Sequence, residues 1–157
     1  MATIEKALQI AAKAHEGQKD KEGLPYILHP LRAMMAVEGE KDQIVAVLHD
    51  VIEDTSVTAD ELRQAGFSDQ VVAAVLCVTH RKDEPYADYV VRCKANEVAR
   101  RVKLADLEDN WRLDRTILRP QRFNADVARL RKYALSYKFL TDQLTEEEYR
   151  ALMEEGG

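Results

Sequence analysis

The chain has 157 residues, of which 46% are hydrophobic and 32% are charged, and its formal net charge is −5. This composition excludes a disordered acidic polymer and fits one soluble globular domain spanning residues 1–157. No basic tail or stripe is present, so neither a nucleic acid nor an anionic membrane is expected as a partner.

The sequence shows no pattern typical of a membrane-spanning helix or a secretion signal. No run approaches the ~18 apolar residues of a membrane-spanning helix, and the first residues lack the apolar region of a secretion signal. The two cysteines, Cys77 and Cys93, are too far apart for a CxxC motif and are expected to be core residues. We therefore expect a cytoplasmic protein.

Apolar residues recur at helical spacing from one end of the chain to the other, which predicts an all-α fold. The first helix is expected to start after Thr3, as a cap, and to end at Gly17. Proline is tolerated in the first turn of a helix, so Pro30 predicts the start of a second helix that ends near Gly39. His29 would then be its cap residue.

The third predicted helix covers residues 41–54 and is apolar on nearly all sides, which is typical of an element surrounded by others. Further helices are predicted from capping signals and apolar periodicity. They begin after Thr58 (ending at Gly66), after Ser68, at Pro85, after Asn96, at about residue 123 (ending near 141) and after Thr145.

The third predicted helix ends in the sequence HDVIEDT, which carries four polar groups in an apolar context: His49, Asp50, Glu53 and Asp54. Burying unpaired carboxylates costs several kcal/mol or more each, unless hydrogen bonds, protonation or a cation compensates. A divalent metal is the simplest compensation. Mixed imidazole and carboxylate ligands suit manganese, iron, zinc or magnesium. The remote ligand candidates are His29 and Asp106.

Other interpretations of these residues stay open. An isolated His-Asp pair is commonly a buried hydrogen-bonded pair, and Glu53 and Asp54 could be solvated carboxylates at a helix end. Tyr26 could pack its loop onto the core or line a pocket. Simple structural roles are also available for the remaining candidates: Asn110 as a helix-end residue, Lys21 and Lys103 as solvated charges, and His15 and His80 as surface or helix-end histidines.

The order of several motifs resembles the HD-domain metal-dependent phosphohydrolases. These motifs are HP at 29–30, HDVIEDT at 49–55 and KLADLEDN at 103–110. With AHEGQ and GLPYILHP upstream, the chain is more narrowly similar to the hydrolase domain of the RelA/SpoT proteins and to the small alarmone hydrolases. The resemblance covers residues 5–115 and implies a single-domain HD-type helical bundle. The C-terminal helices, within 120–155, lie outside it.

The resemblance implies a role for each matching residue. The ligands of one divalent metal, typically manganese, would be His29, His49, Asp50 and Asp106. Glu53 and Asp54 match the pair that positions or activates the attacking water, and Asn110 matches a residue near the substrate. The implied reaction, which belongs to the stringent response, removes the 3′ pyrophosphate from guanosine tetra- or pentaphosphate.

An anionic substrate in an acidic protein needs local cations, and Lys21, Lys103 and Arg112 are closest to the motifs. The chain also departs from the family pattern. Asp20 replaces a basic residue expected against the guanine base, and three further positions differ: Leu107, Asp109 and Leu113. These departures leave two alternatives, hydrolysis of another phosphorylated nucleotide (a monophosphate or a phosphodiester) and alarmone binding without catalysis.

The segment 118–138 carries several cations at helical spacing. Such a stretch is usually a solvated face or a self-association surface. A homo-oligomer therefore stays open as a prediction.

Overall fold

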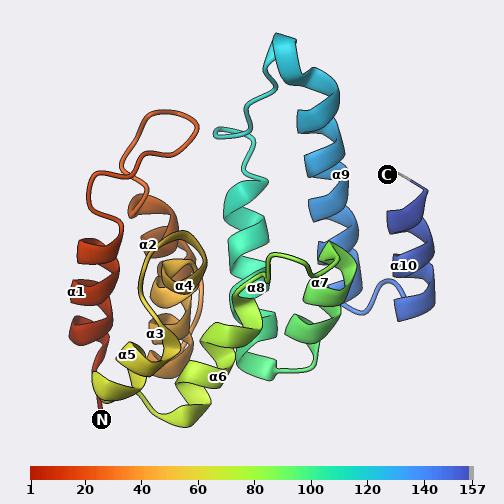
Figure 1. Cartoon of the computed structure of the whole chain (residues 1–157). Coiled ribbons are helices and arrows are strands. Elements are labelled where there is room, and N and C mark those ends of the chain that lie inside the picture. The colour runs from red at the N-terminus through yellow and green to blue at the C-terminus, as the bar shows by residue number, and fades with distance from the viewer. Residues whose placement is uncertain (156–157) are drawn as a thin grey trace.

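The computed structural model describes residues 1–155, which form helices joined by loops (Figure 1). Among these residues the β-structure consists of one isolated antiparallel bridge, between Lys19 and Pro25. The predicted all-α fold is confirmed. No helix in the described part of the chain is both long and apolar enough to span a bilayer.

The helices follow one another along the chain in this order: α1 (Ile4–Ala14), α2 (Leu28–Met35), α3 (Glu40–Leu48), α4 (Val51–Asp54), α5 (Ala59–Gln64), α6 (Asp69–Val78), α7 (Tyr86–Lys94), α8 (Glu97–Asn110), the 3-10 turn η1 (Pro120–Arg122), α9 (Phe123–Leu140) and α10 (Glu146–Glu154).

Helix α3 lies at the centre of the half of the molecule that carries the sequence motifs. It packs against α1, α2, α6 and α8. Val45, Val47 and Leu48 are completely buried on its different sides, as the apolar pattern predicted. Because several helices surround it, α3 holds its last residues in a fixed position relative to α2 and α8.

Several helix starts predicted from capping residues are confirmed. Thr58 and Thr145 each form a capping box with the glutamate three residues later. The side chains of Ser68 and Asn96 each accept a hydrogen bond from the backbone N–H three residues later. These caps satisfy N–H groups that have no partner within the helix.

Two predicted helices differ from the structure. His29 is not a cap: α2 already begins at Leu28, because Ile27 has helical dihedral angles and the N–H of His29 donates to the carbonyl of Tyr26. The predicted helix 41–54 is divided into α3 and α4 at His49 and Asp50. Nδ1 of the His49 ring donates a hydrogen bond to the carbonyl of Ala46. In a regular helix that carbonyl would accept from the N–H of residue 50, so the helix is interrupted here.

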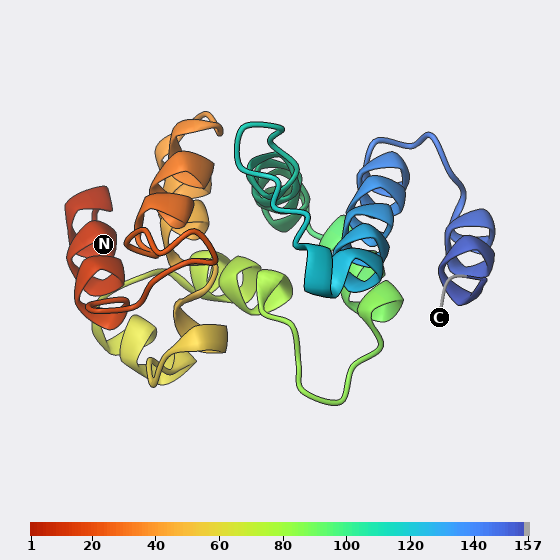
Figure 2. The same cartoon turned by 90° about the horizontal axis from the view of Figure 1, so that it is seen from above.

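Two loops, residues 15–27 and 111–119, approach each other above the ends of α2 and α8 (Figures 1 and 2). Arg115 joins them through ion pairs with Asp20 at 3.1 Å and Glu22 at 3.3 Å. Helix α9 packs on α8, and α10 lies at the outer side of α9, where Tyr149 stacks on Phe139 (Figure 2).

Candidate active site

The four predicted metal ligands come from three regions of the chain and meet at one place. His29 lies in the first turn of α2, His49 and Asp50 occupy the break between α3 and α4, and Asp106 lies in the last two turns of α8. The two histidines and Asp106 are buried. The break in the helix is therefore the local feature that directs His49 and Asp50 toward α2 and α8.

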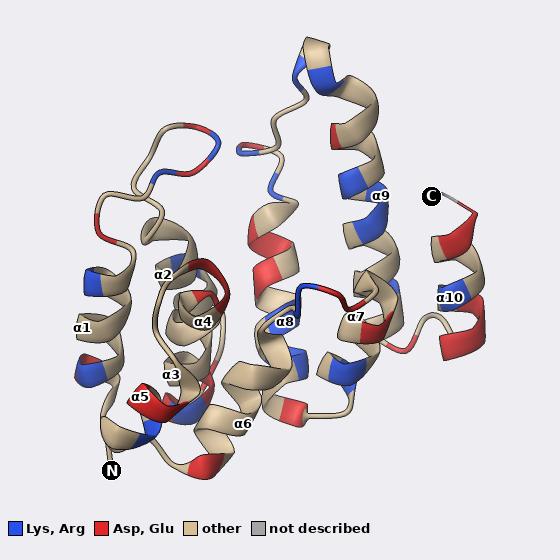
Figure 3. Cartoon of the chain, in the orientation of Figure 1, with Lys and Arg blue, Asp and Glu red and all other residues tan. Residues whose placement is uncertain are grey.

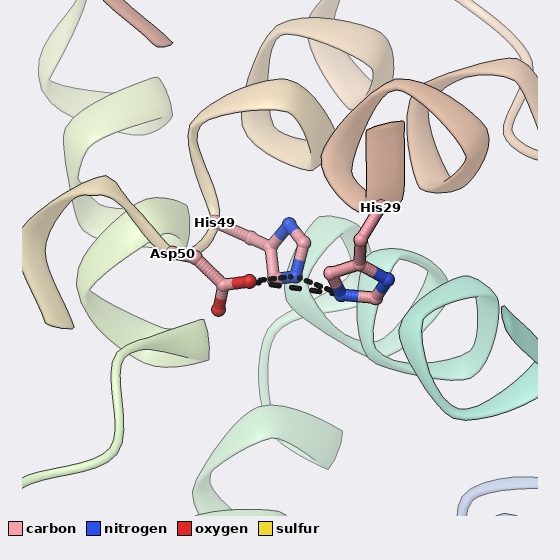
Figure 4. Close-up of side chains that lie close together, drawn as sticks. All are labelled: His29, His49 and Asp50. Atoms are coloured by element: carbon pink, nitrogen blue, oxygen red, sulfur yellow. Dashed lines mark hydrogen bonds and ion pairs between the residues drawn. The ribbon is translucent and has the colours of Figure 1, made fainter. Parts of the chain in front are cut away.

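The donor atoms of these residues converge. Nε2 of His49 lies 3.2 Å from Nε2 of His29 and 3.0 Å from Oδ2 of Asp50. Oδ1 of Asp106 lies 3.1 Å from Nε2 of His29 and 3.7 Å from Nε2 of His49. Figure 4 shows the side chains of His29, His49 and Asp50 directed toward one another. One ligand atom from each of these three lies within 4.8 Å of the others.

The hydrogen bonds made by Nδ1 of each imidazole determine how Nε2 of the same ring can bind a cation. Nδ1 of His49 lies 2.6 Å from the carbonyl of Ala46, which can only accept. Nδ1 of His29 lies 2.6 Å from the carboxylate of Asp109. Each Nδ1 therefore donates a proton, and Nε2 of each ring faces the other ring. Burial opposes protonation of the rings, but Asp106 raises the pKa of His29. Asp50 likewise raises the pKa of His49. In the neutral form of each ring, Nε2 carries a lone pair. Two lone pairs beside two carboxylate oxygens form a donor set that fits a divalent cation.

Asp106 is anchored by two neighbours on its own helix. Nζ of Lys103 lies 2.7 Å from Oδ2 of Asp106, and the amide of Asn110 donates to Oδ1 at 2.7 Å. Burial opposes ionisation, but the Lys103 ammonium and the two imidazoles hold the pKa of Asp106 well below its usual value. Burial likewise opposes ionisation of Asp50, yet His49 lowers the pKa of Asp50 to about 2. Both carboxylates are thus ionised at neutral pH.

Glu53 and Asp54 lie one turn after this cluster, on the more open side of the site. Oε2 of Glu53 accepts a hydrogen bond from the backbone N–H of His80 at 2.8 Å. Partial burial and the negative charge of Asp50 raise the pKa of both Glu53 and Asp54. A carboxylate with a raised pKa is a better proton acceptor near neutral pH.

A cavity of about 560 Å³ opens next to the cluster. It is lined by His29, Asp50, Glu53, Asp54, Asp106 and Asn110 on one side. Its cations are Lys19, Lys21, Lys103, Arg115, Arg129 and Lys132. Figure 3 shows basic residues along α9 and acidic residues near the end of α8. Four of the cations that line the cavity come from the 15–27 loop and α9, and they are called its basic wall: Lys19, Lys21, Arg129 and Lys132.

Curated relatives cover this region of the chain. The guanosine-3′,5′-bis(diphosphate) 3′-pyrophosphohydrolase MESH1 of Danio rerio is 35% identical over 126 residues, which cover 71% of this chain and 68% of that protein. The chain belongs to this pyrophosphohydrolase family. The resemblance to RelA/SpoT-type hydrolases noted in the sequence is thereby confirmed. A scan against protein-family models found no match.

Two further comparisons agree with this family assignment. The guanosine-3′,5′-bis(diphosphate) 3′-pyrophosphohydrolase of Aquifex aeolicus is 40% identical over 80 residues, and the match covers 48% of this chain but 11% of that longer protein. The structure of a metazoan ortholog of SpoT that hydrolyses ppGpp covers 99% of this chain with a TM-score of 0.68 and 24% identity. That likeness supports the HD-type helical fold.

One predicted substrate-binding residue of this pyrophosphohydrolase-family chain lies away from the cavity. Arg112 is exposed and pairs with Asp114 at 2.6 Å, on the side of α8 that faces a second, apolar hollow. Lys21 and Asn110 line the cavity, and Lys103 reaches it as the partner of Asp106. Arg115, three residues after Arg112, lines the cavity in its place.

Two of the departures from the family pattern, Asp20 and Leu107, have a structural explanation. Asp20 accepts hydrogen bonds from the backbone N–H groups of Glu22 and Leu24 and from Arg115, so its carboxylate stabilises the loop. Leu107 is buried in the core. Leu113 is 90% exposed and has no role in the cavity lining among the described residues.

The sequence left the role of one residue of the site open and did not point to others. Tyr26, considered for the core or a pocket, lines the cavity and donates to Oδ2 of Asp50 at 2.6 Å. His80, considered a surface or helix-end residue, follows the end of α6, lines the cavity and stacks on Tyr89. His15, considered a surface or helix-end residue, is the residue that ends α1 and is buried against Tyr26, so the surface alternative is wrong. The spacing of Asp106 and Asp109, i and i+3 on one helix, is the sequence signal that could have identified Asp109.

Proposed function

We propose that this chain is a metal-dependent hydrolase that removes the 3′ pyrophosphate from guanosine 3′,5′-bis(diphosphate). The observation that carries the proposal is the convergence of two imidazole Nε2 atoms and two carboxylates beside a cavity with a basic wall. The names of the relatives support the same substrate.

The metal would be held by the four converging side chains, His29, His49, Asp50 and Asp106. We propose manganese, on the resemblance to the HD hydrolases; zinc, iron and magnesium are the alternatives that the donor set allows. A divalent cation bound there would lower the pKa of water from about 15.7 toward about 7 and would neutralise negative charge on a phosphoryl oxygen.

The residues of the chain itself supply proton transfer and positioning. Water adds to the phosphorus atom attached to the 3′ oxygen, the bond between that phosphorus and the 3′ oxygen breaks, and the 3′ oxygen takes up a proton. Glu53 and Asp54 are the candidates to accept the proton of the water, because their pKa values are raised and they lie beside the ligand cluster. Asn110 and Lys103 keep Asp106 in place.

Substrate phosphates would be held by the basic wall. Burial and the nearby Arg129 and Arg119 lower the pKa of Lys21, and burial and the nearby Lys103 lower the pKa of Lys132. These cations therefore repel one another in the free protein. An anionic ligand that enters the cavity would relieve this repulsion.

The direct test is a phosphate-release assay on the purified chain with MnCl₂. The wild-type chain should release pyrophosphate from guanosine 3′,5′-bis(diphosphate). A chelator should stop this release, and added Mn²⁺ should restore it. Asp50→Ala should release no pyrophosphate. Asp60→Asn, on the exposed start of α5, is the matched control and should keep the wild-type rate. An unchanged rate in Asp50→Ala would contradict the proposal.

A second candidate is hydrolysis of another phosphorylated nucleotide. It is favoured by Asp20, whose carboxylate is used by backbone N–H groups and Arg115, so that this position offers no cation to a guanine base. The two candidate functions are separated by assaying nucleoside monophosphates and phosphodiesters in parallel with guanosine 3′,5′-bis(diphosphate). Hydrolysis of the former compounds but not of the latter would favour the second candidate. Saturable tetraphosphate binding without product would instead favour the non-catalytic alternative. The cytoplasmic location, the lack of a nucleic-acid partner and self-association stay predictions.

A further inference from the structure

Asp109 is a buried carboxylate next to the site. Its side chain is 4% exposed. It accepts hydrogen bonds from Nδ1 of His29 at 2.6 Å, from Nε and Nη2 of Arg32 at 2.6 and 3.1 Å, and from Nη1 of Arg115 at 2.6 Å. Three side chains from α2 and the 111–119 loop are thus held by one group on α8.

The contact with His29 has a chemical consequence. Two guanidinium groups, those of Arg32 and Arg115, donate to both oxygens of the Asp109 carboxylate, so this group is an acceptor only. Nδ1 of His29 must therefore carry the ring proton. In the neutral ring, Nε2 of His29 then carries the lone pair, and this atom faces His49 and Asp106.

The contact with Arg115 extends the same network to the cavity wall. Arg115 reaches past Asp109 to Asp20 and Glu22, which flank Lys21 in the 15–27 loop. The loop itself is shaped by Asp20, which accepts two of its backbone N–H groups. A single carboxylate therefore links the ring orientation of a ligand residue to the position of a cavity cation.

We propose that Asp109 is a positioning residue that fixes His29 in its metal-binding tautomer and, through Arg115, fixes the loop that carries Lys21. The inference rests on the proposed metal site. A hydrogen-bonded carboxylate behind a ligand histidine fixes its tautomer and raises its basicity, and losing such a partner commonly weakens metal affinity by about 10–100-fold.

The experiment compares wild type, Asp109→Asn and the control Asp114→Asn, an exposed acidic residue in the neighbouring loop. The dissociation constant for Mn²⁺ is measured by the electron paramagnetic resonance signal of free Mn²⁺. We expect about a 10–100-fold increase in Asp109→Asn and a change of less than about twofold in Asp114→Asn. Equal affinity in Asp109→Asn and wild type would overturn the inference.

The tautomer is read separately, by long-range ¹H–¹⁵N spectra of the histidine side chains in metal-free wild-type protein. We expect the proton of His29 on Nδ1, and a proton on Nε2 of the neutral ring would overturn the inference even where Asp109→Asn fails to fold. A role in stability alone would lower the unfolding temperature of Asp109→Asn without changing its Mn²⁺ affinity, which also counts against the inference. Failure of the wild type to bind Mn²⁺ would instead refute the proposed metal site.

Discussion

The phenolic hydroxyl of Tyr26 donates a hydrogen bond of 2.6 Å to Oδ2 of Asp50, the oxygen that lies 3.0 Å from Nε2 of His49. This contact ties the loop that follows α1 to a proposed metal ligand at the break between α3 and α4. The ring of Tyr26 also lies next to that of the buried His15, with 5.0 Å between the ring centroids. Tyr26 is therefore placed to hold the Asp50 carboxylate in one orientation.

Replacing Tyr26 by Phe should weaken metal binding while leaving the chain folded. The lost hydrogen bond to a charged group contributes about 1.5–3 kcal/mol, so the Mn²⁺ dissociation constant should rise by about tenfold or more. Calorimetric titration with MnCl₂ measures it. Tyr137→Phe, whose ring lies at the second hollow away from the cluster, is the matched control. Equal Mn²⁺ affinity in both variants would argue against this role.

Glu53→Gln and Asp54→Asn separate proton transfer from metal binding. Each change keeps the size of the side chain and removes its ability to accept a proton. Loss of a general base typically costs about 10²–10⁴-fold in rate, so at least one variant should lose kcat to that extent. Both should bind Mn²⁺ within a few-fold of wild type. If both variants keep kcat, the proton is accepted elsewhere.

Lys21→Ala should raise KM more than it lowers kcat, because Lys21 lines the cavity at a distance from the acidic cluster. Arg112→Ala tests the corrected assignment, since its guanidinium pairs with Asp114 outside the cavity. Steady-state kinetics should show a severalfold larger KM effect for Lys21→Ala. The reverse order would restore Arg112 as the substrate cation that the sequence suggested.

Glu84 offers a prediction on stability and pH. The hydrogen bonds from Arg92 lower the pKa of Glu84 in the folded state, so its contribution to stability is present above the unfolded pKa of about 4.3 and is lost as pH falls. Glu84→Gln should lower the free energy of unfolding by about 1–2 kcal/mol at pH 7. Urea unfolding should show this difference shrinking at about pH 3; a constant difference would contradict the assignment.

Residues with local signals were predictable from the sequence, and residues defined by tertiary contacts were not. The caps at Thr58, Ser68 and Thr145 follow from short-range hydrogen bonding and appear as expected. The break at His49 was missed, because the apolar pattern continues through it and the cause is a ring contact with Ala46.

The same distinction applies to the site. The motif spacing predicted a ligand cluster, and the side chains of His29 and His49 do lie together. The roles of Arg115 and Arg112 could not be told apart, since both are arginines near one motif and only the path of the 111–119 loop decides which enters the cavity. The contact between Asp109 and His29 likewise depends on the packing of α2 against α8, which the sequence does not show.

The proposed activity depends above all on one divalent cation being bound jointly by His29, His49, Asp50 and Asp106. Anomalous X-ray diffraction at the manganese edge, from crystals grown with MnCl₂, tests this binding most directly. We predict one strong peak within coordination distance of Nε2 of both histidines and of one oxygen from each aspartate. Crystals with no peak at this position, or with a peak that Asp50 and Asp106 do not contact, would contradict the proposal.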